Sequence, residues 1–79
     1  MLEANNWYKV MDNDKLESNT VVFKIGCIFK VVKYNNHFVT VYSPVVNRSF
    51  HLQHKTMDCI RTVKVDSVVA ELLYSKVVV

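Results

Sequence analysis

Three histidines and two cysteines are the residues of this 79-residue chain that could hold a metal ion. His51 and His54 are three positions apart, Cys59 follows them, and either His37 or Cys27 would be the fourth ligand. Zinc prefers four nitrogen or sulfur ligands in a tetrahedron. However, there is no Cys-x-x-Cys pair, and His51 falls in an expected strand, where side chains three apart point to opposite faces. We therefore expect surface histidines beside a turn, and neither a metal nor another cofactor.

The two cysteines could instead supply a nucleophile paired with a histidine. Such a pair needs a third group to orient it and a site for the oxyanion, and a reactive thiol needs an electropositive, partly exposed setting. Cys27 precedes Ile28 and Phe29, and Cys59 precedes Ile60, so both are predicted to pack in the core as reduced thiols. The sequence also lacks a glycine-rich phosphate loop, a serine nucleophile elbow and a paired-carboxylate pattern. We therefore expect a protein that is not an enzyme.

Basic and aromatic residues along the expected strands are candidates for binding nucleic acid. Cations neutralise phosphates and aromatic rings stack on bases, so a face that carries both could form a groove. The candidate residues are Lys30, Lys33, Tyr34, Tyr42, Arg48 and Arg61. The formal net charge of +3 is mild for a protein committed to nucleic acid. The alternative is that these cations alternate with core residues and only solvate the outer face of the domain.

Apolar residues in one turn and near the C-terminus form the second candidate surface. They are Val45, Val46, Leu72, Leu73, Val77, Val78 and Val79. They exceed what so small a core requires, and contiguous exposed apolar patches usually mark a partner or an oligomer interface. The alternative is that the C-terminal segment caps the domain and that the tail pairs within it.

The length and composition are those of one small folded domain spanning residues 1–79. Hydrophobic residues make up 51% of the chain, which is too apolar for disorder, and the abundance of valine favours strands. No stretch approaches the roughly 18–20 apolar residues that a membrane span needs. The first residues also lack a basic region followed by an apolar one, so no secretory signal is expected. We expect a cytoplasmic protein that does not bind membranes.

Alternation of apolar and polar residues, together with turn residues, predicts five short strands. The expected strands are Trp7–Met11, Cys27–Tyr34, His37–Tyr42, Arg48–Gln53 and Cys59–Val65. Residues 12–20 are expected to form a long loop, and residues 43–47 a turn. Asn35 and Asn36 are expected to form a tight turn, because asparagine tolerates a positive φ. Gly26 is expected to mark a bulge or a close backbone approach. Residues 54–58 are a short connection that could be one helical turn.

Residues 67–75 are predicted to form a short helix that Asp66 or Ser67 caps. One face of this helix would carry Val68, Val69, Leu72 and Leu73. A continuous strand from Val68 onward is the alternative, although the Ala-Glu-Leu-Leu segment favours a helix. The three valines at 77–79 are expected to form an edge strand or an apolar end that docks elsewhere.

The order of these elements resembles that of SH3-like barrels. Trp7–Val10 opens the domain, and Phe23–Val31 resembles the segment in which a glycine enters a hairpin strand. The remaining strands then follow at short intervals. This resemblance covers most of residues 7–65. It implies a mainly β fold, namely a small five-stranded barrel, followed by a short helix and tail at about 66–79.

The resemblance says little about function, because architecture alone does not determine it. KOW-like and Tudor-like barrels bind nucleic acid or modified peptides. Polyproline binding is not expected, because the first loop holds Asp12, Asp14 and Glu17 but no aromatic residue. The small, Lys- and Asn-rich chain with one glycine also resembles short accessory proteins of large bacteriophages, which would place it in the host cytoplasm.

These observations favour a small non-catalytic module that binds another protein, or itself, through the C-terminal apolar residues. In a bacteriophage, such a module would be an accessory or host-modulating protein. Nucleic-acid binding by the basic and aromatic residues is the alternative function.

Overall fold

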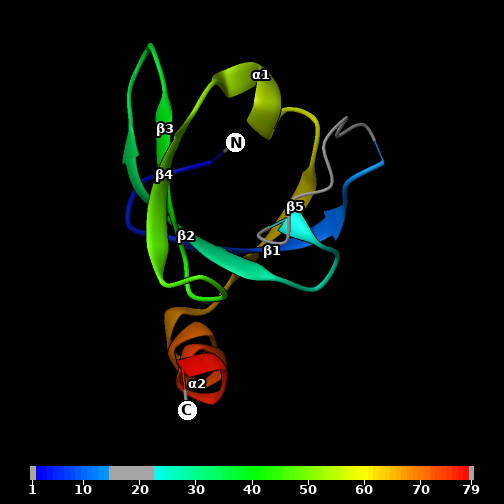
Figure 1. Cartoon of the computed structure of the whole chain (residues 1–79), viewed down its shortest axis with the longest axis vertical. Coiled ribbons are helices and arrows are strands. Elements are labelled where there is room, and N and C mark those ends of the chain that lie inside the picture. Colours follow the sequence, from blue (N-terminus) through cyan, green and yellow to red (C-terminus); the bar gives the residue numbers. More distant parts are fainter. Residues whose placement is uncertain (1, 15–22, 79) are drawn as a thin grey trace.

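The computed structural model describes residues 2–14 and 23–78 of the chain (Figure 1). In these residues five antiparallel strands form one sheet, and two helices accompany it. The elements, in chain order, are β1 (Trp7–Asp12), β2 (Ile28–Tyr34), β3 (Val39–Ser43), β4 (Arg48–Leu52), α1 (His54–Met57), β5 (Arg61–Val65) and α2 (Ser67–Val78). The predicted small, mainly β domain with a C-terminal helix is therefore confirmed, as is the single helical turn after the fourth strand.

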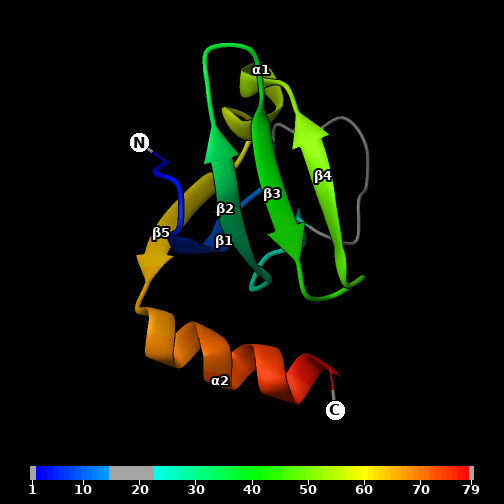
Figure 2. The same ribbon diagram turned by 90° about the vertical axis from the view of Figure 1, so that its left-hand side faces the viewer.

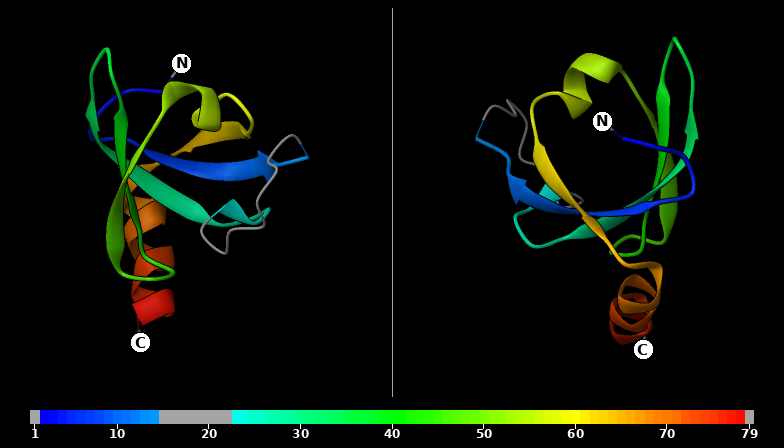
Figure 3. Two further views of the ribbon diagram at one scale, coloured as in Figure 1. Left: turned by 45° about the horizontal axis from the view of Figure 1, so that its top comes forward. Right: turned by 180° about the vertical axis from the view of Figure 1, so that it is seen from behind.

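The strand order across the sheet is β4-β3-β2-β1-β5. Every neighbouring pair is antiparallel, so β1 lies between β2 and β5. Figure 3 shows that the sheet is strongly curved. Within the described residues no pairing joins β4 to β5, so the sheet is open where the sequence predicted a closed barrel. Two register shifts, between Val10 and Asp12 in β1 and between Val31 and Lys33 in β2, accompany the curvature.

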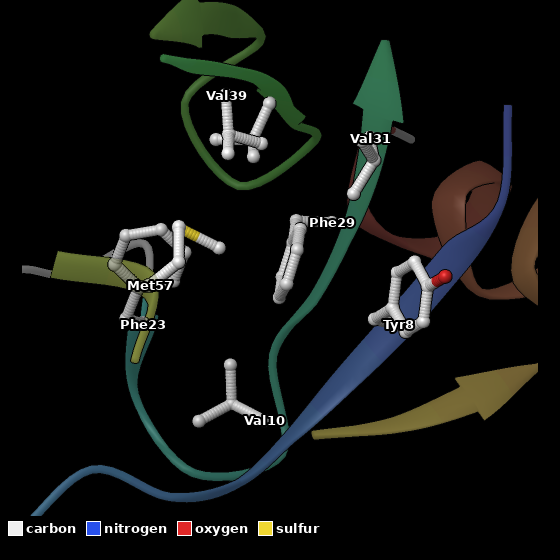
Figure 4. Close-up of a cluster of buried hydrophobic side chains, with 8 residues drawn as sticks. Tyr8, Val10, Phe23, Phe29, Val31, Val39 and Met57 are labelled. Carbon is white, nitrogen blue, oxygen red and sulfur yellow. The ribbon is translucent and has the colours of Figure 1, made fainter. Parts of the chain in front are cut away.

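The concave face of the sheet holds the main core. Phe29 is fully buried at its centre, with Phe23 edge-on at 5.5 Å and Tyr8 stacked at 5.9 Å between ring centroids (Figure 4). The buried residues of this cluster are Tyr8, Val10, Phe23, Phe29, Val31, Val39, Val41 and Met57. Met57 comes from α1, so this single helical turn covers one end of the core.

The convex face carries a row of side chains that crosses the whole sheet. Cross-strand pairing places Val65, Trp7, Lys30, Tyr42 and Ser49 side by side, one from each strand. A second, smaller buried cluster forms on this face from Trp7, Ile28 and Ala70. Because Ala70 belongs to α2, the helix is attached to the convex face rather than to the main core.

The turn between β2 and β3 differs from the expected two-residue turn. It spans residues 35–38, so the first two residues predicted for the third strand belong to the turn. The side-chain oxygen of Asn35 accepts hydrogen bonds from the backbone N–H groups of His37 and Phe38, at 2.8 and 2.9 Å. This arrangement is an Asx turn, which needs no positive φ. The expected positive φ at Asn35 or Asn36 is therefore wrong, and in the described backbone asparagine has a positive φ at Asn5 and Asn47 instead.

Gly26 lies in the turn before β2, where its φ is +94°. Its N–H donates to the carbonyl of Val10 at 2.8 Å, but a Cβ at this position would meet no atom within 4 Å. The positive φ therefore accounts for the glycine, and a close approach that excludes a side chain is not found. On the long first loop, the Asp12 carboxylate accepts from the N–H of Asp14 at 2.9 Å. The remainder of the predicted loop, residues 15–20, lies outside the described residues.

The C-terminal helix is longer than predicted. The Asp66 carboxylate accepts from the N–H of Val68 at 2.9 Å, which confirms the expected N-terminal cap. The helix then continues to Val78, so an edge strand at Val77 and Val78 is wrong. Val79 lies outside the described residues.

Candidate functional site

Helix α2 contacts the sheet through one narrow face. Ala70 is fully buried, and the ring of Tyr74, one turn later, lies 6.5 Å from the Trp7 ring and 6.0 Å from the Tyr42 ring. Residues four apart lie above one another on a helix, so Ala70 and Tyr74 form a single line of contact. The small Ala70 side chain lets the helix backbone approach Trp7 and Ile28 closely.

The opposite face of α2 is apolar and exposed to solvent. Val68 is 67% exposed, Leu72 is 63% exposed, and Val69 and Leu73 beside them are 48% and 36% exposed. Helical spacing places these four residues on one side of the helix. Val68 and Leu72 lie roughly opposite Ala70 and Tyr74, and Leu73, the least exposed of the four, lies at the border with the docking face. We call these four residues the outer stripe. The shared face predicted from the sequence is confirmed, but it is not the face that docks on the sheet.

The other predicted apolar residues have different positions. Val45 is exposed in the turn between β3 and β4, whereas Val46 is half-buried against the main core. Val77 and Val78 lie in the last turn of α2, and their side chains are outside the described part of the structure. The outer stripe therefore includes Leu72 and Leu73 from the predicted patch, but not the turn valines or the tail.

A cluster of hydroxyl groups joins α2 to the neighbouring turn. The hydroxyl of Tyr42 donates to the side-chain oxygen of Asn47, and it lies 3.3 Å from the hydroxyl of Tyr74. The hydrogen bond to Tyr74 is the largest cause that raises the pKa of Tyr42 to about 12, and burial adds to it. These contacts fix one side of α2 and leave the outer stripe uncovered.

The residues predicted to bind nucleic acid do not form one surface. Lys30 and Tyr42 are cross-strand neighbours on the convex face. Lys33 is two rows away opposite Thr40, on the far side of a register shift. The six candidates are placed as follows: Lys30 opposite Tyr42 in the convex row, Tyr42 beside α2, Lys33 further along β2, Tyr34 beside α1, Arg48 over the Phe50 ring, and Arg61 opposite Asp12.

The histidines make local structural contacts. The Nε2 atom of His54 lies 2.6 Å from the carbonyl oxygen of Asn35, and its ring packs edge-on against Tyr34. The Nδ1 atom of His51 lies 2.8 Å from the hydroxyl of Thr40. Among residues 2–14 and 23–74, whose side chains are described, no three His, Cys, Asp or Glu side chains come together as metal ligands.

A cleft of about 560 Å³ opens between α1, β5 and the N-terminal segment. Tyr8 and Met57 form part of its wall, and Glu3, Asp58 and Lys64 are its charged groups. The N–H of Glu3 donates to the Tyr8 hydroxyl at 2.8 Å, which holds the N-terminal segment against the sheet. The cysteines are elsewhere: both are half-buried rather than buried as predicted, and Cys59 donates to the Lys55 carbonyl at 3.2 Å.

Comparison with known proteins identifies no relative. No family model matches the chain, and neither a curated protein nor a solved structure matches it significantly. Evidence for a function must therefore come from the geometry of this chain. In the described part of that geometry, no helix is both long and apolar enough to cross a membrane.

Two pairs of residues on α2 were not predicted as site residues from the sequence. Val68 and Val69 are as exposed as the predicted leucines, and the repeated spacing of four residues from Val68 to Leu72 and from Val69 to Leu73 was the signal. The docking role of Ala70 and Tyr74 was also missed. Their spacing of four residues is the same signal on the opposite face.

Proposed function

We propose that this protein is a small non-catalytic interaction module that binds another protein through the outer stripe of α2. The observation that carries the proposal is that four adjacent aliphatic residues face solvent on a helix that docks through its other side. The described ring and core contacts of α2 with the sheet come from Ala70 and Tyr74, and polar residues on the outside of the helix would leave these contacts intact. The apolar character of the stripe therefore requires a reason other than the fold.

The energy available from covering the stripe is on the scale of a weak association. Fully burying a valine or leucine side chain contributes about 1.5–3 kcal/mol. Because the stripe residues are between 36% and 67% exposed, covering them contributes roughly 1 kcal/mol each. A comparable apolar surface on the partner would double this gain, which then has to exceed the entropy cost of association.

The strand order supports an SH3-like classification, which we propose for the domain as a whole. The proposal is based on the Trp7–Val10 and Phe23–Val31 segments and on five strands that form one antiparallel sheet in the order β4-β3-β2-β1-β5. The bacteriophage origin and the cytoplasmic location remain predictions.

Nucleic-acid binding is the second proposal. Lys30 lies between Trp7 and Tyr42 in the convex row, which combines a cation with aromatic rings. However, α2 covers Trp7, and the hydroxyl of Tyr42 is engaged by Asn47. A gel shift at low salt with single- and double-stranded DNA and RNA tests this proposal, since phosphate contacts weaken steeply with salt. If none of these four nucleic acids is retarded, nucleic-acid binding is excluded.

Site-specific photocrosslinking in the cells that naturally produce the protein tests the interaction proposal. A photoreactive residue, benzoylphenylalanine, replaces Leu72 in one variant and Ile25 in another. Ile25 is the matched control because it is 64% exposed, as Leu72 is at 63%, but belongs to the turn before β2. We expect a discrete protein adduct from position 72 only. Equal adducts from both positions, or none from either, would contradict a role for the stripe.

A further inference from the structure

We propose that the partner of the outer stripe is a second copy of this chain, with the two α2 helices packed antiparallel. This inference depends on the interaction function proposed above and names the partner. It follows from three properties of α2: the symmetry of the stripe, the charges at the two ends of the helix, and the absence of any described element beyond it.

The stripe is complementary to itself when one helix is reversed. Its residues follow the order Val-Val-x-x-Leu-Leu, centred between Ala70 and Glu71. A two-fold axis at this point places Val68 opposite the second copy's Leu73, and Val69 opposite the second copy's Leu72. Each level of the interface then pairs a smaller side chain with a larger one, which favours interdigitation of the two helices. Each copy uses the same patch, which is the definition of a closed two-fold interface.

The charges on α2 favour the antiparallel orientation over the parallel one. Asp66 precedes the helix and caps it, and the chain carries a lysine at position 76, in the last turns. Reversal of one helix places Asp66 of each copy at the end that carries Lys76 of the other. The helix dipoles also oppose each other in this arrangement, which adds a small favourable contribution. A parallel pair would place like charges and like dipole ends together.

The outer stripe is open to a partner of this size. Figure 2 shows α2 lying across the base of the sheet, with β1–β5 all on one side of the helix. Figure 1 shows the same helix end-on, below the sheet, with no other described element beyond it. Two copies joined through α2 would therefore have their sheets on opposite sides of the helix pair, without collision.

The size of the stripe predicts a reversible dimer. Stable, specific interfaces commonly bury about 1,200–2,000 Å² in total. Four partly exposed side chains per copy provide less than that, so we expect a dissociation constant between about 10 µM and about 1 mM. Because apolar contacts dominate, added salt should not weaken the association, in contrast to binding through phosphates.

Sedimentation equilibrium over about 10 µM to about 1 mM tests the dimer, a range set by the expected affinity. We expect the apparent mass of the wild type to rise with concentration, from near the mass of the monomer towards that of the dimer. Leu72→Glu should remain monomeric, whereas the matched control Ile25→Glu should dimerise as the wild type does. If Leu72→Glu dimerises with unchanged affinity, another surface is responsible and the proposal is overturned.

A charge-complementation experiment tests the pairing itself and does not depend on a loss of function. One variant carries Val69→Glu with Leu72→Glu, and the other carries Val69→Lys with Leu72→Lys. Each variant alone should be monomeric because like charges would meet across the axis. An equimolar mixture should form a heterodimer, since position 69 of one copy faces position 72 of the other. A mixture that stays monomeric, although the wild type dimerises, would overturn the antiparallel arrangement.

The photocrosslink at position 72 separates failure of this inference from failure of the proposed function. If the wild type is monomeric at every concentration and position 72 crosslinks to a different protein, the second copy is the wrong partner and the interaction function stands. If the wild type is monomeric and position 72 crosslinks to nothing, both proposals fail.

Discussion

The hydroxyl groups of Tyr42 and Tyr74 lie 3.3 Å apart and join helix α2 to strand β3. Tyr42 also donates to the side chain of Asn47, which has a positive φ of 53° in the β3–β4 turn. One tyrosine therefore connects a strand, a turn and the C-terminal helix. Because this connection fixes one side of α2 against the sheet, the position of the outer stripe on its other side depends on it.

Alkaline pH is expected to destabilise the fold through Tyr42. The hydrogen bond to Tyr74, burial, and the electrostatic interaction with Tyr74 together raise the pKa of Tyr42 from 10.0 to about 12. A pKa that is higher in the folded state means that folding favours the protonated phenol. The resulting stabilisation is complete below pH 10, and is lost as the pH rises from there through about 12.

Urea unfolding at a series of alkaline pH values measures this effect, and phenolate absorbance follows the ionisation directly. We expect one late-titrating tyrosine in the wild type. Tyr42→Phe should remove that late step together with its share of the pH dependence. A late step that persists in Tyr42→Phe would show that another tyrosine is responsible.

Removal of the Tyr74 ring is expected to loosen α2 without unfolding the sheet. Trp7 is the only tryptophan, it is 4% exposed, and it lies against Tyr74 and Ala70. In Tyr74→Ala we expect Trp7 fluorescence to shift to longer wavelength and become more accessible to quenchers. The loss of unfolding free energy should be roughly 1–3 kcal/mol, less than for a fully buried aromatic residue, because Tyr74 is only partly buried. Leu72→Ala, on the opposite face, should leave the Trp7 spectrum unchanged.

Local patterns predicted the strands because buried and exposed side chains alternate along each strand, as apolar and polar residues alternate in the sequence. In β2, Phe29 and Val31 face the core while Lys30 between them faces outward, and a strand requires this alternation. The Asp66 cap and the helical turn at residues 54–57 also depend only on neighbouring residues. These features involve short-range geometry, so the sequence contains the information directly.

The docking face of α2 could not be predicted because apolar residues occur on both sides of the helix. Val68 and Leu72 form one apolar line, and Ala70 and Tyr74 form another. Hydrophobic periodicity favours the bulkier line, yet the fold selects the smaller one. Ala70 allows the close approach that covers Trp7, and this choice depends on the shape of the sheet.

The dispersal of the basic candidates could not be predicted either, because it depends on strand register. Lys30 and Tyr42 become neighbours only through the pairing of β2 with β3. Arg61 is paired instead with Asp12, across a register shift at the other edge of the sheet. Charge counts along the chain do not contain these long-range pairings. The absence of pairing between β4 and β5 among the described residues also depends on long-range geometry, so the sequence pattern could not predict it.

Truncation of Phe29 is expected to remove most of the stability of the domain. The side chain is fully buried and contacts two other aromatic rings, so Phe29→Ala should cost about 3–5 kcal/mol. Small domains have total stabilities only slightly larger than this. Urea or thermal unfolding measures the loss. Val32→Ala is the control on the same strand, because Val32 is exposed, and it should change stability by less than about 0.5 kcal/mol. A loss below about 1 kcal/mol for Phe29→Ala would be inconsistent with a central core position.

Loss of the Asn35 side chain is expected to destabilise the β2–β3 turn. Its oxygen accepts from two backbone N–H groups, and each such hydrogen bond contributes about 0.5–1.5 kcal/mol. Asn35→Ala should therefore lower the free energy of unfolding by roughly 1–2 kcal/mol, because one of the two N–H groups is exposed and can bond to water instead. Asn35→Asp keeps the acceptor oxygen and should retain most of the stability, whereas the exposed Asn36→Ala should have little effect. Amide hydrogen exchange at His37 and Phe38 reports on the two bonds individually. Unchanged exchange in Asn35→Ala would show that the turn is held by the backbone bond from Asn35 to the Phe38 carbonyl rather than by the side chain.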